Sequence, residues 1–474
     1  MEPNLIYDFI IIGGGPTGST AAYYLTGLGY KVLVFEKYKF PRQHEGESLL
    51  PFTNALFREM GIYEEMKKRY VRKPGVRFTN SGGTQSSTWC FKNILQDKND
   101  FLSFHVVRAD FDDMLLKHCR KKGAVALEET KVISVDLNTP DKIVLVKTQD
   151  PKEIITEWKC KFIIDASGQD TFLAKRLQNK NAYKELDRTA FLNHWKDAKY
   201  SQGIDVGLLQ IIYLPSEKGG WFGIQPVGKN RLSVGLVINR SYLKQEKAKL
   251  VAKGIEKWQE AFYLQEINAC PITREILANG TTLQKMIIVS DYSYYAEQTI
   301  GDNFAILGDA GKFLDPIFAS GVYLGMNSAK MFAEAIHVKL TQGKEAGDKA
   351  IKEANKNIDG AYSLVEKFIN IFYDPNSFNL AEVSSTSESK YKSYEQAFLL
   401  VHFLLAGDFF NKYETYSGFL DMLSSPKQFA RWKHLVVNRV NNQELTCGTD
   451  YDTIFGEILG DAVEKACETA TPKE

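Results

Sequence analysis

The sequence has few cysteines and almost no net charge, and both shortages narrow its possible functions. Its six cysteines are scattered through 474 residues without a Cys-x-x-Cys pair. We therefore expect no zinc or other metal site and no disulfide framework, with the thiols reduced. The 59 basic residues are balanced by 58 acidic ones. This balance argues against a nucleic-acid partner held by bulk electrostatics and favours recognition of something small.

Long hydrophobic runs are also missing. The apolar run from Phe9 to Ile12 is short, ends in glycines and follows the acidic residues Glu2 and Asp8, so it does not read as a signal peptide. With no transmembrane segment either, we expect a cytoplasmic protein. The chain is 44% hydrophobic and long enough for roughly two or three domain-sized units around a sizeable core.

The first forty residues predict a βαβ unit that binds a dinucleotide. An apolar strand leads into a glycine-rich turn, an Ala-rich helix and a second strand that ends at Glu36. In this fingerprint one glycine forms the tight turn, one lets the backbone approach the pyrophosphate, and one lets helix pack on strand. The acid can accept hydrogen bonds from the adenosine ribose. The predicted nucleotide-binding residues here are Gly13, Gly15, Pro16, Gly18, Glu36 and Lys37.

The remaining periodicity predicts an α/β fold with an inserted antiparallel sheet. Short alternating runs between Lys131 and Lys159 indicate a β-meander, and the strand 162–164 follows it. Strands recur between residues 189 and 240, and apolar residues at helical spacing follow residue 322. Residues 382–394 are predicted as a loop. We expect a discontinuous Rossmann-type FAD-binding domain (1–188 and 281–345), a β-sheet substrate-cavity domain (189–280) and a helical C-terminal region (346–474).

The segment Pro41 to Leu49, PRQHEGESL, follows the βαβ unit and is expected beside the cofactor. Arg42 can pair with phosphate, and Gly46 and Ser48 allow close approach to an isoalloxazine ring. PRxxxGESL resembles a segment of flavin-dependent halogenases and of geranylgeranyl-reductase-like flavoproteins. An ordinary surface loop is the alternative.

The resemblance to flavin-dependent halogenases, within the FAD monooxygenase superfamily, extends over about 330 residues. It rests on FHVVRADFD (104–112), IDASG (164–168) and GDAGKFLDPIFASGV (308–322), whose end is most similar to the phenol and pyrrole branch. It implies a fold like that of p-hydroxybenzoate hydroxylase, ribityl hydroxyls bound by Asp309, and halide held by the Ser320-Gly321 backbone. The cofactor residues it implies are Arg108, Asp165, Gly168, Gly308, Asp309, Pro316 and Gly321.

Lys73 matches the active-site lysine of flavin-dependent halogenases. In that chemistry, as the resemblance implies it, FADH₂ and O₂ give a C4a-hydroperoxide, which oxidises chloride or bromide to hypohalous acid. The lysine delivers the oxidant to one ring carbon, either as an ammonium that hydrogen-bonds it or as a haloamine. The alternative is an ordinary solvated charge, because Lys73 ends a basic cluster that includes Lys67, Lys68, Arg69 and Arg72.

Two positions depart from the halogenase pattern. The common Trp-x-Trp-x-Ile-Pro stretch reads WFGIQP over residues 221–226, so Gly223 and Gln225 replace the second Trp and the Ile. Phe318 stands where tryptophan halogenases carry a glutamate, which suggests an electron-rich substrate that needs less activation. Trp221, Phe318 and His194 are candidates to line the substrate cavity, although Trp221 and His194 also fit structural roles. A base for a phenol, if one is needed, could be Glu47, His105, His194 or a tyrosine.

These features predict an oxidoreductase: a two-component, FAD-dependent halogenase acting on a phenol, pyrrole or related ring. No second dinucleotide fingerprint is present, so FADH₂ should come from a partner flavin reductase. The substrate is either free or tethered to an acyl or peptidyl carrier protein. The alternatives are a flavin monooxygenase or geranylgeranyl-type reductase without halide activation, and a flavoprotein that serves mainly to dock a carrier protein.

Overall fold

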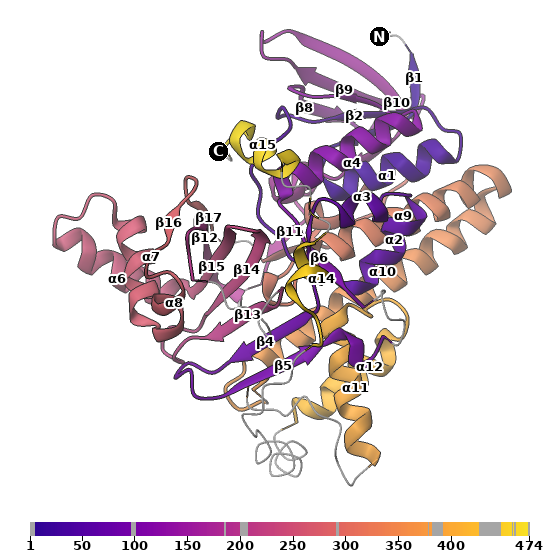
Figure 1. Cartoon of the computed structure of the whole chain (residues 1–474). Coiled ribbons are helices and arrows are strands. Elements are labelled where there is room, and N and C mark those ends of the chain that lie inside the picture. Colours follow the sequence, from indigo (N-terminus) through magenta and orange to yellow (C-terminus); the bar gives the residue numbers. More distant parts are fainter. Residues whose placement is uncertain are drawn as a thin grey trace.

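The computed structural model describes residues 5–95, 101–183, 186–199, 207–290, 293–377, 379–381, 392–425, 447–456, 458 and 461–472. One end of the molecule is a sheet whose core is parallel (Figure 1). At its centre, residues 32–35 and 9–12 are continuous apolar runs buried on both faces, as parallel strands covered by helices must be. The strands are β7 (Val125–Leu127), β2 (Val32–Phe35), β1 (Ile6–Ile12), β10 (Ile155–Asp165), β19 (Phe304–Ile306), β9 (Val144–Gln149) and β8 (Lys131–Asp136).

The predicted meander is confirmed, with one difference. The runs predicted at residues 154–159 and 162–164 form the single strand β10. Its first half alternates exposed and buried residues and pairs antiparallel with β9. Its second half is fully buried and pairs parallel with β1 and β19. One strand therefore carries two hydrophobic patterns, because its neighbours change along its length.

The second large sheet confirms the strands predicted between residues 189 and 240. β17 (Ile287–Ser290) pairs with β12 (Arg188–Lys196) outside the main strand order. β4 (Gly75–Thr79) and β5 (Ser86–Cys90) come from the N-terminal part of the chain. Helices α6 (Arg240–Ala252), α7 (Trp258–Ala269) and α8 (Pro271–Ile276) pack against this sheet (Figure 1). The domain boundaries themselves stay a prediction. In spatial order the strands are β16 (Thr281–Thr282), β12 (Arg188–Lys196), β15 (Arg231–Asn239), β14 (Trp221–Gly228), β13 (Leu209–Tyr213), β4 (Gly75–Thr79) and β5 (Ser86–Cys90), with β17 at Ile287–Ser290.

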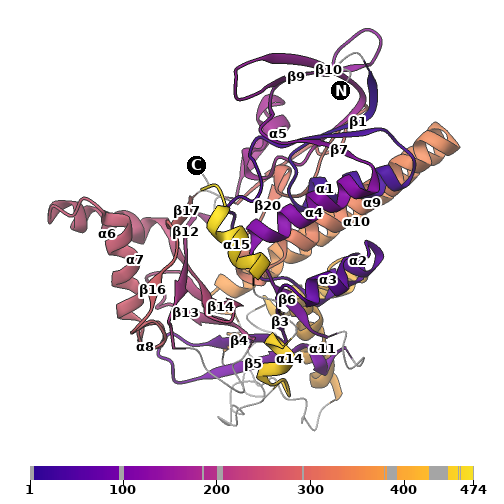
Figure 2. The same ribbon diagram turned by 45° about the horizontal axis from the view of Figure 1, so that its top comes forward.

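Helices join the two sheets. The long pair α9 (Gly321–Gln342) and α10 (Lys344–Tyr373) forms a hairpin that lies along α1 (Pro16–Gly27) and α4 (Arg108–Lys122) (Figure 2). None of the helices in the described part of the chain has the length and apolar character needed to cross a bilayer. The shorter elements are α2 (Asn54–Glu59), α3 (Tyr63–Lys67), β3 (Val71–Lys73), β6 (Ser103–His105), α5 (Phe172–Arg176), β11 (Lys180–Ala182), β18 (Tyr294–Ala296) and β20 (Lys312–Phe313).

The C-terminal region is helical, as predicted. It contains α11 (Lys392–Ala406), α12 (Tyr413–Leu423), α14 (Tyr451–Phe455) and α15 (Asp461–Thr469). The loop predicted at residues 382–394 falls outside the described residues up to 391, and its last three residues begin α11. α15 packs on α4, so the end of the chain returns to the N-terminal part (Figure 2).

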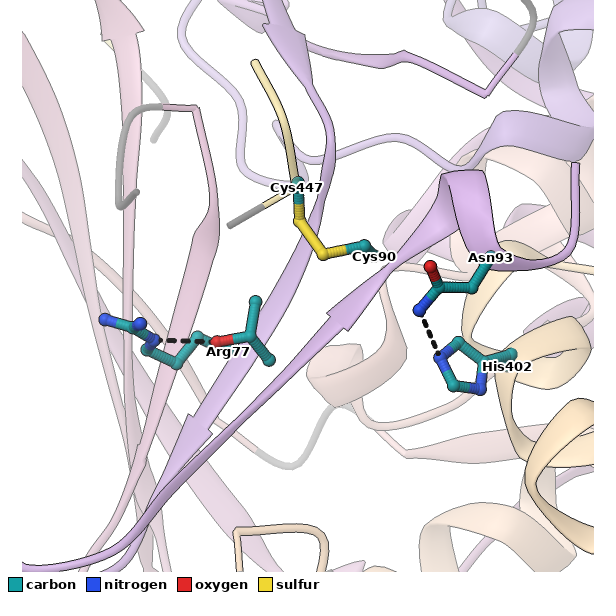
Figure 3. Close-up of a disulfide and its surroundings, with 6 residues drawn as sticks. Arg77, Cys90, Asn93, His402 and Cys447 are labelled. Carbon is teal, nitrogen blue, oxygen red and sulfur yellow. Dashed lines mark hydrogen bonds between the residues drawn. A yellow bond between two sulfur atoms is a disulfide. The ribbon is translucent and has the colours of Figure 1, made fainter. Parts of the chain in front are cut away.

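The prediction that the cysteines are all reduced is wrong. Cys90, at the end of β5, forms a disulfide with Cys447, 357 residues later (Figure 3). Sequence spacing could not show this pair, because only the return of the C-terminal segment to β5 brings the two residues together. The other four cysteines are free thiols, and three of them are buried.

We expect the Cys90–Cys447 disulfide to stabilise the folded chain. A native crosslink that closes a long loop typically contributes about 2–4 kcal/mol, so Cys447→Ser should lower the melting temperature by several degrees. The same loss should appear when a reductant is added to the wild type. Cys467→Ser, which removes the one free thiol that is only partly buried among the described residues, provides the control. Equal melting temperatures for the wild type and Cys447→Ser would show that the crosslink has no such role.

Candidate functional site

Two adjoining cavities lie between the two large sheets. The first holds about 1260 Å³, counting space open to solvent, and is lined mainly by apolar groups from the antiparallel sheet and from the start of α9. The second holds about 1200 Å³, counted in the same way, and lies along the glycine turn and the end of β2. His44, Arg108, Gln169 and Asp309 line both cavities. The pair therefore offers an extended site with one largely apolar half and one half that is more polar, which suits a dinucleotide with a flat ring system.

The glycine turn is shaped for a phosphate group. Gly13 has φ +99°, and a Cβ there would lie 2.4 Å from the Ala166 carbonyl oxygen. A Cβ on Gly18 would lie 2.0 Å from the Gly13 carbonyl oxygen. Gly15 caps α1 and Pro16 opens it, so the helix N-terminus faces the second cavity. Only glycine allows this packing, and the exposed N–H groups provide an anion site.

The predicted ribose acceptor Glu36 is in place at the end of β2. Its carboxylate accepts hydrogen bonds from the Gly14 N–H at 2.8 Å and from the Tyr38 N–H at 3.0 Å. These bonds fix its orientation at the wall of the second cavity. Lys37 also lines this cavity and pairs with Asp170 at its exposed rim.

Asp165 has a different place from the one predicted for a cofactor contact. It is fully buried and accepts hydrogen bonds from the N–H groups of Ser167, at 2.9 Å, and Leu173, at 2.6 Å. It is not among the residues that line the second cavity, whereas Ser167 and Gly168 are. Asp165 therefore holds the turn that forms the cavity wall.

A buried ion cluster connects the two arginines of the site. Asp112 is fully buried and receives two hydrogen bonds from Arg108, at 2.7 and 2.9 Å, and an ion pair from Arg42 at 3.2 Å. Burial opposes its ionisation, but the two guanidinium groups outweigh this and lower the pKa of Asp112. The Nη1 atom of Arg42 has no hydrogen-bond partner although it is buried, and the residue lines the second cavity. A free guanidinium donor beside a glycine turn fits a pyrophosphate.

The segment from Gly308 to Gly321 closes the other side. Gly308 has φ +60°, and a Cβ there would lie 2.5 Å from Thr17 Oγ1 on α1. Asp309, Pro316, Ser320 and Gly321 all line the first cavity. Ser320 is the residue before α9, and the first N–H groups of a helix have no acceptor within it. The start of α9 therefore places backbone N–H groups at the wall of the cavity.

The halogenase-like stretch on β14 forms one wall of the first cavity. Trp221, Gly223 and Gln225 lie on the same face of the strand and all line the cavity. A Cβ on Gly223 would lie 2.8 Å from Cζ3 of Trp221, so the Trp221 ring covers the place where the second Trp of the pattern would stand. The Trp221 indole N–H donates to the Tyr373 hydroxyl at 2.8 Å, which donates to Asp315 at 2.9 Å.

The other two residues predicted for the substrate cavity lie elsewhere. Phe318 stacks on Phe368 of α10, with ring centres 3.9 Å apart, and does not line the first cavity. His194 is buried behind the cavity, where its Nε2 lies 2.8 Å from a Glu47 carboxylate oxygen. Arg231 approaches the other ring nitrogen at 3.4 Å. His194 therefore orients Glu47, which does line the cavity.

Lys73 ends β3 and is 1% exposed, which excludes the solvated charge considered above. Its ammonium nitrogen donates to the Leu49 carbonyl at 3.0 Å and lies 5.4 Å from the centre of the Phe91 ring. Burial alone lowers the pKa of Lys73 to about 7. The residue does not line the first cavity. Its hydrogen-bond partner Leu49 follows Ser48, which does.

Comparison with known proteins places this site in a family. The model of the FAD binding domain matches residues 7–357. The flavin-dependent halogenase armH3 of Armillaria mellea is 30% identical over 349 residues, which make up 71% of this chain and 69% of the relative. The chain belongs to the flavin-dependent halogenases. It is thus a flavoprotein enzyme that binds FAD.

Other halogenases match over still more of the chain. The 1H-pyrrole-2-carbonyl-[peptidyl-carrier protein] chlorinase of Pseudomonas fluorescens is 27% identical over 391 residues, 78% of this chain and 84% of that protein. Among solved structures, the myxobacterial chondrochloren halogenase CndH aligns with a TM-score of 0.71 at 25% identity. That alignment covers 99% of this chain and 98% of CndH.

The cavities fit the FAD of this halogenase. The glycine turn and the unpartnered Arg42 donor suit the pyrophosphate, and the start of α9 faces the more apolar cavity, which suits the flavin ring. Three residues that hold other residues of the site were missed from the sequence: Asp112, Asp315 and Tyr373. Asp112 lies in the FHVVRADFD segment, but no local pattern shows that its carboxylate holds both arginines.

Gly18→Ala should prevent the halogenase from retaining FAD. The added methyl would lie 2.0 Å from a backbone oxygen and 3.3 Å from the Ala166 side chain, so α1 must move away from β1. We expect an affinity for FAD at least about 100-fold weaker, measured by flavin fluorescence during titration. Gly418→Ala is the control, because a methyl there meets nothing within 4 Å. Unchanged FAD binding in Gly18→Ala would contradict this assignment of the turn.

Proposed function

We propose that this halogenase uses FADH₂, O₂ and a halide to form hypohalous acid, and that Lys73 delivers this oxidant to an electron-rich aromatic ring. The observation that carries the proposal is the burial of Lys73. No carboxylate among the described residues pairs with its ammonium group, and burial alone sets its lowered pKa. Burying an unpaired cation destabilises a protein, so such a lysine is a candidate for function.

Bound FAD supplies the oxidising chemistry, in which reduced flavin, O₂ and halide yield hypohalous acid. The protein residues hold the reactants. Arg42 and the N–H groups of the glycine turn bind the pyrophosphate, and Asp309 binds the ribityl chain. The donors of Ser320 and Gly321 at the start of α9 hold the halide, because a helix N-terminus attracts anions.

The segment 47–49 lies between the first cavity and Lys73, and Lys73 acts on the side away from the cavity. In its ammonium form it donates a hydrogen bond to the oxygen of hypohalous acid and polarises the oxygen–halogen bond. When the ring attacks the halogen, a carbon–halogen bond forms and the oxygen–halogen bond breaks. The departing hydroxide takes a proton from Lys73 and leaves as water. The proton that the ring then loses restores the ammonium group. A pKa near 7 suits a group that must give and regain a proton.

The substrate class follows from what the site lacks. Phe318 stacks on Phe368, so the position at which tryptophan halogenases carry a glutamate holds no carboxylate here. We propose a phenol, pyrrole or related ring, which reacts without such a base. One relative is named as a chlorinase of a carrier-bound pyrrole, which supports a carrier-tethered substrate; a free ring is the alternative.

The test of this function supplies FADH₂ from a separate flavin reductase, with bromide and a panel of phenols, pyrroles and indoles. We expect brominated product from the phenols or pyrroles only when both bromide and the reductase are present. Rapid NADPH oxidation without the reductase would instead support a single-component hydroxylase. Hydroxylated product alone would contradict halogenation.

A further inference from the structure

The strand paired with the one that carries Lys73 places a histidine on the same face. β3 and β6 pair antiparallel, with Val71 opposite His105 and Lys73 opposite Ser103. Side chains of directly paired residues lie on one face of a sheet, so Lys73, Ser103 and His105 share a face. Arg72 lies over the Phe104 ring at 4.6 Å, which shows that the intervening residues occupy the opposite face.

A third strand extends this face to the first cavity. Ser48 forms an antiparallel bridge with His105, and backbone hydrogen bonds at 2.8 and 2.9 Å join Glu47 and Leu49 to β6. The Ser48 side chain therefore lies on the face shared by Lys73 and His105. Ser48 also lines the first cavity. One continuous face thus leads from that cavity, past His105, to Lys73.

This face carries polar atoms that are buried and have no hydrogen-bond partner. They are Oγ of Ser48, Oγ of Ser103 and Nδ1 of His105. His105 and Ser103 are both fully buried. An unpaired buried polar atom costs about 1–3 kcal/mol, so three on one face point to a polar ligand that fits between them.

His105 can only accept a hydrogen bond at its free nitrogen. Its Nε2 lies 2.9 Å from the Gly207 carbonyl oxygen, which cannot donate, so Nε2 carries the hydrogen. Burial, and next the positive charge of Lys73, lower the pKa of His105 to about 3. The ring is therefore neutral at neutral pH, and Nδ1 is a bare acceptor beside a lysine donor.

We propose, on the basis of the proposed function, that His105 and Lys73 together hold hypohalous acid, with His105 Nδ1 accepting its O–H hydrogen bond and Lys73 donating to its oxygen. Hypohalous acid has one O–H donor and one oxygen acceptor, and these two residues match both. Held at its oxygen, the molecule leaves its halogen end free for the ring. Ser48 stands at the cavity end of the same face, where the oxidant enters.

The other candidate groups do not fit this role. Glu47 and His194 are paired to one another at 2.8 Å. Glu47 immediately precedes Ser48 in the strand, so its side chain lies on the face opposite Lys73. His105 is therefore the candidate that the geometry brings to the lysine.

The test measures how hypobromous acid is divided between product and escape. For each FADH₂ oxidised, brominated phenol is counted by mass spectrometry, and free hypobromous acid is trapped with monochlorodimedone. His105→Phe keeps a flat ring but removes the acceptor. We expect about a tenfold fall in product, the effect of one lost hydrogen bond, with a matching rise in trapped oxidant and unchanged FADH₂ oxidation. If His105 had only a structural role, its replacement would not increase the amount of hypobromous acid trapped by monochlorodimedone.

His105→Gln should recover at least half of the product, because its amide can donate to the Gly207 carbonyl and still offer an acceptor. The matched control is His118→Phe, since His118 also donates from Nε2 to a backbone carbonyl, at 2.7 Å, but lies on α4 away from this face. His118→Phe should give the same amounts of brominated product and trapped hypobromous acid as the wild type. If His105→Phe does not fold, His105→Met makes the same test.

Two results would overturn this assignment and leave the proposed function intact. In the first, His105→Phe gives the same amounts of brominated product and trapped hypobromous acid as the wild type. In the second, His105→Phe loses product without a rise in trapped hypobromous acid. If the wild type yields neither brominated product nor trapped oxidant, the proposed function fails and this assignment fails with it.

Discussion

Lys73→Met is expected to lower the yield of halogenated product at least about 100-fold, while FADH₂ is still oxidised and hypohalous acid escapes. Methionine fills the space of the lysine but cannot donate a hydrogen bond. In the proposed function the flavin reacts in the first cavity, which Lys73 does not line, so oxidant formation should continue. A positioned proton donor typically contributes about 10²–10⁴ in rate, which sets the size of the loss.

Product and trapped hypobromous acid are measured in the same reactions. Lys68→Met is the matched control, because Lys68 belongs to the same basic cluster but is exposed. It should leave both quantities unchanged. A Lys73→Met variant that makes product at the wild-type rate would show that the lysine is not part of the reaction.

The second large effect concerns stability and its dependence on pH. Burial lowers the pKa of Lys73 from 10.5 to about 7, so between these values the unfolded chain binds a proton that the folded chain does not. Stability then rises with pH across this window, by about 1.4 kcal/mol per pH unit from this residue. Below pH 7 both states are protonated and the full destabilisation is present; above pH 10.5 it is absent.

Lys73→Met should therefore be the more stable protein at pH 6. Its free energy of unfolding should be higher by up to about 5 kcal/mol, from which the contribution of the lost hydrogen bond to the Leu49 carbonyl is subtracted. This advantage should shrink steadily between pH 7 and pH 10, where the wild type becomes equal or better. Urea unfolding of both proteins at several pH values measures the difference. A difference that does not change with pH would mean that Lys73 keeps its ordinary pKa.

Together these two predictions describe a residue that weakens the fold and enables the reaction. An unpaired buried charge destabilises the folded protein, so removing it should raise stability while abolishing the halogenation that depends on it. An inactive variant that is also less stable at pH 6 would instead suggest that Lys73 contributes to packing.

The sequence predicted those parts of the fold and site in which one residue type is required by local geometry. Gly13 and Gly18 are examples, since backbone atoms lie where their side chains would be. The strands and long helices could be predicted because their burial repeats along the chain. The position of Lys73 followed from resemblance to the family, but its burial did not, because Lys73 ends a basic cluster whose members Lys67, Lys68 and Arg69 are exposed or partly exposed.

Features that depend on long-range contacts could not be predicted. The disulfide joins residues 357 apart, and the Asp112 carboxylate meets Arg42 only through the fold. Trp221 was ambiguous in sequence, and the structure gives it two roles, as cavity wall and as donor to Tyr373 of α10. His105 was one of several possible bases until strand pairing placed it on the face of Lys73.

The most direct measurement of the central claim is a single turnover. Protein loaded with FADH₂ is mixed with O₂, bromide and a phenol from the panel, and the products are identified by mass spectrometry. We predict a brominated phenol with the two-isotope pattern of bromine from the wild type, and trapped hypobromous acid in place of product from Lys73→Met. Hydroxylated phenol from the wild type, or bromination retained in Lys73→Met, would contradict the claim.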